Sequence, residues 1–177
     1  MSGLDVIDSV CGKIQGVFQD YKLLNKSGVL QAVKVFLQYT PLPAGITFNA
    51  PNTGYDDDDY DTNFPCIIVK SDGITDKEER QINQNRTAIR LLFGVYDDKP
   101  ECTGWRDIMA MIDRARYYLL TERVIARKYH VGMPIESTLL EADTYPLYFG
   151  EMKFWLEGGR PIMKHDFVYE RYLQHGQ

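Results

Sequence analysis

Apolar and polar positions at the start of the chain follow the period of an amphipathic helix. The apolar side chains recur three or four positions apart, at Leu4, Ile7, Cys11, Ile14, Phe18 and Tyr21. This spacing places them along one side of a helix, because an α-helix makes one turn in about 3.6 residues. The segment therefore predicts a first helix that packs its apolar side against the rest of the chain.

The next segment fits two periods. The apolar positions of residues 29–37 suit a helix, and Ser27 stands where it would cap the N-terminus of that helix. The same stretch also alternates as a strand would, at Val33, Val35 and Leu37. We favour the helix and expect helices over residues 4–38. A loop is expected over residues 40–63, because Pro, Gly, Asn and Asp dominate there.

Two strands are predicted next. FPCIIVKSDG, residues 64–73, holds a β-branched run that stops at Ser-Asp-Gly, as a core strand does when it enters a turn. RTAIRLLFGVY, residues 86–96, alternates, and one of its faces carries Ile89, Leu91, Phe93 and Val95. We expect these two strands to pair antiparallel. The charged residues 74–85 between them are interpreted as an excursion into solvent.

The clearest helix follows DDKPECTG. Thr103 is placed to cap its N-terminus, and the charge of Asp107 suits the positive end of the helix dipole. The helix is expected to end near Glu122. Its buried stripe is predicted to hold Trp105, Ile108, Met111, Ile112, Ala115 and Leu119.

Extended segments dominate the remainder of the chain. Residues 124–140 have a short, extended pattern, and Pro134 limits central pairing there because it has no N–H to donate. In TYPLYFGEMKFWLEGG the two faces alternate, and Gly158 and Gly159 close the strand. Its covered face is predicted to carry Tyr148, Gly150, Met152, Phe154 and Leu156.

This order of elements predicts an α+β fold with a mostly antiparallel sheet, because the strands come in neighbouring pairs with helices grouped around them. The 177 residues, 44% of them hydrophobic, suffice for one core and hardly for two. We expect a single domain over residues 1–177. Within it, the helices cover 4–38, the long loop 40–63, the sheet and main helix 64–159, and a C-terminal tail 160–177.

Charge and cysteine content argue against several classes of partner. A net charge of −5 and a pI near 5.2 leave no positive excess for nucleic acid or for an anionic membrane. There is no long apolar run and no signal-peptide pattern, so we expect a cytoplasmic protein. The cysteines, Cys11, Cys66 and Cys102, are odd in number and far apart, which indicates neither disulfides nor zinc. Reduced thiols are expected, two of them buried.

The acidic residues raise an alternative of another class, a metal-dependent enzyme. YDDDDYD places Asp56–Asp59 in sequence, and Asp97 and Asp98 follow a predicted strand. A calcium loop alternates its ligands and adds a glycine and a distal glutamate at fixed positions, and this run does not. Adjacent carboxylates repel one another, so a solvated loop is the favoured interpretation.

Catalytic chemistry has little support in the sequence. No histidine stands at metal-ligand spacing from an acidic or thiol partner, and surface positions are expected for His130, His165 and His175. Cys66 lies in an apolar run, where a cysteine is more often core than nucleophile. We therefore expect no enzyme, no cofactor, and no catalytic or metal-binding residue.

The aromatic residues exceed what one covered face of a strand can hold. Exposed aromatic side chains are enriched in protein interfaces. The interface candidates lie in or beside the last strand and in the tail that follows it: Tyr145, Tyr148, Phe149, Trp155, Tyr169 and Tyr172. A subunit of an assembly is therefore expected.

Four segments together resemble a known family. FPCIIVKSDG, a second strand ending FGVYDD, the helix GWRDIMAMIDRARYYLL and the strand TYPLYFGEMKFWLEG are similar to the tail terminator and tail completion proteins of long-tailed bacteriophages, particularly those of Gram-positive hosts. The likeness covers residues 64–159 and carries no catalytic signature. It does not extend to residues 1–63.

The resemblance implies an α+β fold with helices packed on one face of the sheet, and a homo-oligomer, a hexameric ring. Such a ring caps the tail tube, ends its polymerisation and joins the head. The implied partners are further copies of this chain, the tail tube protein and the head–tail connector proteins. The implied location is the host cytoplasm during assembly and then the junction of tail and neck in the virion. A head–tail connector, or neck, protein is the alternative within the same class.

Overall fold

The computed structural model describes residues 3–41, 63–79, 82–140 and 144–159, and it contains two helices among ten elements. In chain order these are α1 (Gly3–Phe18), β1 (Lys22–Leu24), β2 (Leu30–Ala32), β3 (Lys34–Leu37), β4 (Cys66–Glu79), β5 (Ile82–Tyr96), α2 (Gly104–Glu122), β6 (Val124–Ile125), β7 (Tyr129–Leu140) and β8 (Leu147–Gly159). The long loop predicted for residues 40–63 and the tail 160–177 lie almost wholly outside the described residues.

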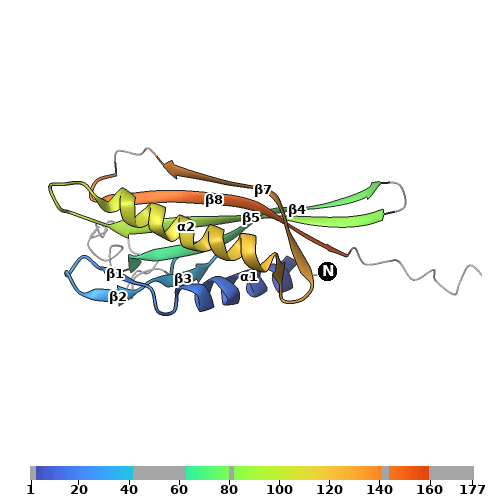
Figure 1. The fold of residues 1–177 in the computed structure, drawn as a ribbon, viewed down its shortest axis with the longest axis horizontal. Coiled ribbons are helices and arrows are strands. Elements are labelled where there is room, and N and C mark those ends of the chain that lie inside the picture. Colours follow the sequence, from blue (N-terminus) through green and yellow to red (C-terminus); the bar gives the residue numbers. More distant parts are fainter. Residues whose placement is uncertain (1–2, 42–62, 80–81, 141–143, 160–177) are drawn as a thin grey trace, which may run out of the picture.

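Six strands form one curled sheet in the order β3-β4-β5-β8-β7-β6, and β1 pairs with β2 beside it (Figure 1). The pairs β4–β5, β5–β8, β8–β7 and β7–β6 are antiparallel, whereas β3 runs parallel to β4, so the sheet is mixed. The fold is therefore α+β. None of the helices in the described part of the chain is long and apolar enough to cross a membrane.

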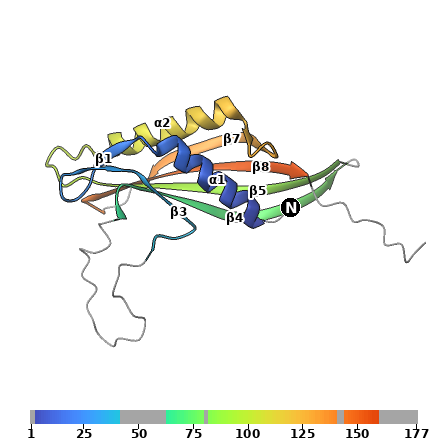
Figure 2. The same ribbon diagram turned by 90° about the horizontal axis from the view of Figure 1, so that it is seen from below.

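The core is one buried cluster to which the sheet and both helices contribute. On β5 the side chains of Ile89, Leu91, Phe93 and Val95 are buried, as their alternation predicts. Neighbouring strands bring Ile67 and Val69 opposite Phe93 and Leu91, and β8 brings Met152 and Phe154 opposite Leu91 and Ile89. Side chains of α1 and α2 join the same buried cluster. Figure 2 shows the ribbons of both helices against the sheet. Burial of each such side chain contributes about 1.5–3 kcal/mol to folding.

Glycine at two positions lets α2 approach β8 closely. A Cβ on Gly150 would lie 2.5 Å from Cγ2 of Ile108, and a Cβ on Gly104 would overlap the ring of Tyr148. Because Gly104 and Gly150 have no side chain, the first turn of α2 packs directly against the start of β8. The predicted antiparallel pairing of β4 with β5 and the predicted covered face of β8 are both confirmed.

Helix α2 is confirmed, but one residue of its predicted stripe is wrong. Five of the six residues are buried, whereas Trp105 is 46% exposed. The reason is that Gly104 takes the inward position against Tyr148, so the next side chain turns outward. Thr103 is the N-cap residue but makes no capping side-chain bond, and its Oγ1 donates to Oδ2 of Asp97 at 3.1 Å.

Helix α1 is also confirmed, with its buried side rotated. Leu4 is 72% exposed and Cys11 is only half-buried, while Val6 and Val10 are fully buried. The expectation of two buried cysteines is therefore wrong: Cys66 is buried, Cys102 is exposed, and all three thiols are free.

The second N-terminal helix, part of the predicted 4–38, is wrong. Residues 30–37 form β2 and β3, and β3 pairs with β4 from Lys34–Cys66 to Leu37–Val69. The strand alternation prevailed because pairing with β4 satisfies the backbone and helix propensity is only a weak preference. Oδ1 of Asn25 accepts the amides of Ser27 and Val29, so Ser27 lies in a turn and caps no helix.

The charged excursion predicted for residues 74–85 is wrong as well. Strand β4 continues to Glu79 and β5 begins at Ile82, and they stay paired throughout. Asn85 donates to Asp76 at 2.7 Å between directly opposed positions, which shows that polar side chains support the ladder here. By contrast, the expected effect of Pro134 is confirmed, because pairing of β7 with β8 is irregular between Gly132 and Glu136.

Candidate protein interfaces

The structure divides the predicted interface residues between two surfaces. Tyr145, Tyr148 and Phe149 lie at the start of β8, together with Trp105 of α2. Trp155 lies seven residues after Tyr148 on β8, which places it roughly 23 Å from Tyr148 at about 3.3 Å per residue. Tyr169 and Tyr172 lie outside the described residues. The four described candidates therefore do not form one site.

The first surface, called the aromatic end, is a hollow of about 120 Å³ lined by Trp105, Leu139, Leu140, Tyr145, Leu147, Tyr148 and Phe149. Trp105 is 46% exposed, Leu140 41% and Tyr145 56%. Sequence reasoning placed Trp105 in the core and overlooked Leu140. The glycine that precedes Trp105 was the available signal, since it leaves the inward position without a side chain.

Two hydrogen bonds hold the aromatic end in shape. The hydroxyl of Tyr145 donates to the backbone oxygen of Asp98 at 2.7 Å, and the amide of Asp97 donates to the oxygen of Pro146 at 2.9 Å. They join the segment between β7 and β8 to the segment between β5 and α2. The exposed ring of Tyr145 is thus held in place before any partner arrives, which lowers the entropy lost on binding.

Tyr148 and Phe149 point to opposite faces of β8, and both act mainly in packing. Tyr148 lies against Gly104, and burial raises the pKa of its phenol to about 12, so the ring stays neutral near pH 7. Phe149 packs edge-to-face on Phe64 with 5.8 Å between ring centroids. Only Tyr145 of these three is well exposed to a partner.

Asp97 and Asp98 follow β5, and the carboxylate of Asp97 accepts hydrogen bonds that stabilise the turn before α2. Asp97 is buried and accepts from the hydroxyl of Thr103 and the amide of Lys99. Desolvation, followed by the charge of Asp97, raises the pKa of Asp107. Within the described ranges, no three His, Cys, Asp or Glu side chains gather as a metal site would require. Asp56–Asp59, the other half of the metal alternative, lie outside them, and His130 is exposed as expected.

The second surface, called the open face, is the face of β5 and β8 that carries Arg86, Arg90, Lys153 and Trp155. Charged side chains pair across its strands, Arg86 with Glu157 at 2.8 Å and Arg90 with Asp72 and Glu151, and Lys153 pairs with Glu151 of the same strand at 2.6 Å. Exposed pairs of this kind contribute about 0–1 kcal/mol each. Their main effect is that the charges of the open face largely neutralise one another.

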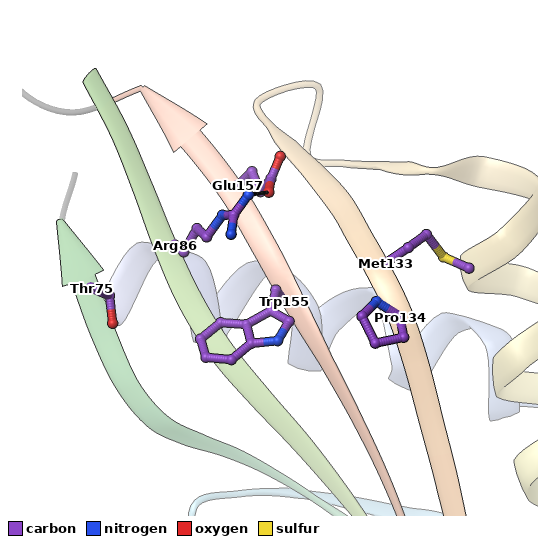
Figure 3. Close-up of a pocket in the computed structure, with 6 residues that line it drawn as sticks. All are labelled: Thr75, Arg86, Met133, Pro134, Trp155 and Glu157. Atoms are coloured by element: carbon purple, nitrogen blue, oxygen red, sulfur yellow. Dashed lines mark ion pairs between the residues drawn. The ribbon is translucent and has the colours of Figure 1, made fainter. Parts of the chain in front are cut away.

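A groove, called the Trp155 groove, crosses this face beside the irregular part of β7. One side is a hollow of about 250 Å³ lined by Thr75, Arg86, Met133, Pro134, Trp155 and Glu157. Figure 3 shows the indole of Trp155 between Arg86 on β5 and Pro134 on β7. A second hollow of about 360 Å³ adjoins it on the other side of Trp155.

The short edge strands β3 and β6 cover only part of the long strands next to them, β4 and β7. Strand β3 pairs with Cys66–Val69, and the Gln38 side chain then accepts the amide of Ser71 at 3.2 Å. Past Ser71 the outer edge of β4 has no strand partner among the described residues. At the other side β6 pairs only with Tyr129 and His130, so the outer edge of β7 is similarly unpaired within the described chain. Such edges are templates for pairing with another chain.

The sequence matches no family model and no curated protein.

Proposed function

We propose that this chain is a structural protein of a bacteriophage virion, a tail terminator or tail completion subunit. In this proposal, copies close into a ring on the finished tail tube, end its polymerisation and offer a surface to the head–tail connector proteins. The strings over residues 64–159 support the proposal by their resemblance to that family. Assembly would take place in the host cytoplasm, and the ring would stay at the junction of tail and neck.

The fold expected for such a subunit is a mostly antiparallel sheet with both helices on one face. Four antiparallel strand pairs against one parallel pair support the first part. The single core cluster to which α1 and α2 both contribute supports the second. Among the described residues, the outer edge of β4 past Ser71 and the outer edge of β7 past His130 have no strand partner, so they are available for contacts with other subunits.

The two sheet edges suit a closed ring. A ring needs a heterologous contact, in which one patch of a subunit meets a different patch of the next. The outer edge of β4 and the outer edge of β7 lie on opposite sides of the sheet and differ in sequence. Pairing of one with the other would extend the sheet from subunit to subunit, and each contact would leave the next edge available until the ring closes.

The observation that carries the proposal is the aromatic end. Trp105 and Tyr145 expose large rings on a scaffold tied by the Tyr145–Asp98 hydrogen bond. Fixed aromatic anchors are the residues that dominate binding energy in protein interfaces. We assign this surface to the contact with the tail tube, where docking needs shape and no chemical step.

The proposal is tested with tail tubes polymerised from the tube protein of the same genome. Light scattering and negative-stain images of the purified protein are expected to give a closed ring. Added to growing tubes, the protein is expected to cap tube ends and stop elongation. The double variant Trp105→Ala with Tyr145→Ala is expected to keep the mass of the ring and to lose tube binding, because truncation of two anchors at a contact costs about 2 kcal/mol or more each.

A matched control is Tyr117→Ala on α2. Tyr117 is 74% exposed and lies outside the aromatic end, so its loss is expected to leave capping intact. Failure of the wild-type chain to bind tube ends contradicts the proposal. Binding to isolated connector rings without binding to tube ends would favour a neck protein instead, and capping by the double variant would contradict the role of the aromatic end.

A further inference from the structure

The Trp155 groove has the character of a covered surface. Trp155 is 40% exposed and Met133 57% exposed, and Pro134 lies between them on β7. An indole on the solvent side of a sheet, with an apolar hollow on each side, leaves apolar area in water that burial would stabilise by about 25 cal/mol per Å². The surrounding charges are largely paired with one another, so they do not select a strongly charged occupant.

Polar groups at the rim can still accept a partner of mixed character. Arg86 pairs through Nη2 with Glu157, and its Nε has no hydrogen-bond partner among the described residues. A guanidinium has five N–H donors, so this ion pair leaves donors for a further carboxylate or carbonyl. The suitable occupant therefore combines aromatic or aliphatic side chains with acceptors.

The chain carries such a segment directly after the groove. Strand β8 ends at Gly159, four residues beyond Trp155 and about 13 Å further along the strand. Residues 160–177 follow, RPIMKHDFVYERYLQHGQ, and hold three aromatic residues beside Asp166 and Glu170. Gly158 and Gly159 still pair with β5, and Pro161, two residues later, is a residue that favours a turn.

The length of this segment is sufficient. Eighteen residues remain after Gly159 in the 177-residue chain, because 177 − 159 = 18. They span up to about 60 Å when extended, several times the distance back to Trp155. A tether this short gives an effective concentration on the order of millimolar, which a separate partner would have to exceed.

We propose that residues 160–177 fold back and bind in the Trp155 groove of the same chain. The segment supplies three aromatic side chains, Phe167, Tyr169 and Tyr172, as partners for Trp155, and two carboxylates, Asp166 and Glu170, as acceptors for Arg86. Tyr169, Tyr172 and Trp155 then form one internal contact, so these three interface candidates serve the subunit itself. The proposal does not depend on the assignment to a phage tail.

The test uses the full chain with Trp105→Phe, which leaves Trp155 as the only tryptophan. Acrylamide quenching of Trp155 is compared with the quenching in the same chain carrying Phe167→Ala, Tyr169→Ala and Tyr172→Ala. The triple variant is expected to be quenched several-fold more strongly and to emit at longer wavelength. A synthetic peptide of residues 160–177, added to the triple variant, is expected to restore the shielding.

Two controls keep the test decisive. With Trp155→Phe in place of Trp105→Phe, quenching of Trp105 is expected to be the same with and without the three alanines. A far-UV circular dichroism spectrum equal to that of the parent shows that the triple variant is folded. Equal quenching of Trp155 in the two chains overturns the proposal. Shielding that disappears on dilution also overturns it, because the segment would then come from a second copy.

Discussion

Replacement of Gly150 by alanine tests whether the close approach of α2 to β8 is required. The added Cβ would lie 2.5 Å from Cγ2 of Ile108 and 3.1 Å from Cδ1 of Ile112, both on the buried side of α2. Ordinary contacts begin near 3.4 Å, so α2 must move outward or Ile108 must leave its rotamer. The movement would shift the first turn of α2, which carries Trp105.

The size of the effect follows from two opposing terms. Overpacking of this kind costs about 1–3 kcal/mol. Alanine also restricts the unfolded chain and so returns about 0.4–1 kcal/mol. The net loss is about 1–2 kcal/mol, which lowers the melting temperature by about 2–8 °C for a chain of this length. Thermal unfolding followed by circular dichroism at one fixed protein concentration measures it, because assembly would make the melting temperature depend on concentration.

Gly132→Ala is the matched control, because Gly132 also lies in a strand and its added Cβ would meet Trp155 only at 3.4 Å. Its melting temperature is expected to stay the same or rise slightly. Ile108→Ala provides a second check, since the Gly150→Ala methyl would fill part of the space that it opens, and the two changes are expected to be less than additive. A Gly150→Ala protein as stable as the Gly132→Ala protein would refute the reasoning.

Two further predictions concern titratable groups. Thiol reagents at pH 8 are expected to modify Cys102 rapidly and Cys66 only after unfolding, because burial raises the pKa of Cys66 to about 12; equal rates in the native protein would contradict this. Tyr129→Phe is expected to lower the melting temperature at pH 7, because the Tyr129 hydroxyl donates to Asp5 at 2.6 Å. That bond lowers the pKa of Asp5 below 3.8, so its contribution is present above pH 3.8 and is lost as the solution becomes more acidic. Desolvation, followed by the bond to Asp5, raises the pKa of Tyr129 from 10.0 to about 12, so the tyrosine contribution is lost only as the pH rises through that value. The variant should therefore lose less stability than the parent between pH 5 and pH 3, and an unchanged slope in thermal melts would count against the bond.

Where one local pattern decides the structure, the sequence was sufficient to predict it. The stripe of α2 from Ile108 to Leu119 and the alternation of β5 are both periods of long segments, and both are confirmed. Residues 29–37 carried two periods at once, and the choice between them depended on β4, which lies about 30 residues further along the chain. The periodicity of a short segment does not show which distant strand it will pair with.

The candidate surfaces were predictable only in part. The sequence predicts Tyr145 as an interface residue, and it is exposed. The helical spacing places Trp105 in the buried stripe. In the structure Gly104 takes the inward position beside Tyr148, and the side chain of Trp105 therefore points outward. The charge of residues 74–85 predicts a solvated excursion, whereas these residues form a paired hairpin in which Asn85 is buried. Charged side chains indicate that a segment contacts solvent, but contact with solvent does not distinguish a loop from a strand.

The place of β5 has a consequence for synthesis of the protein. Its two neighbours are β4, made just before it, and β8, whose first residue follows its last by about 50 positions. A nascent chain that stops after α2 would therefore carry β5 with one side unpaired, and an unpaired strand of this kind is prone to aggregate. Completion of the centre of the sheet must wait until the last strand leaves the ribosome.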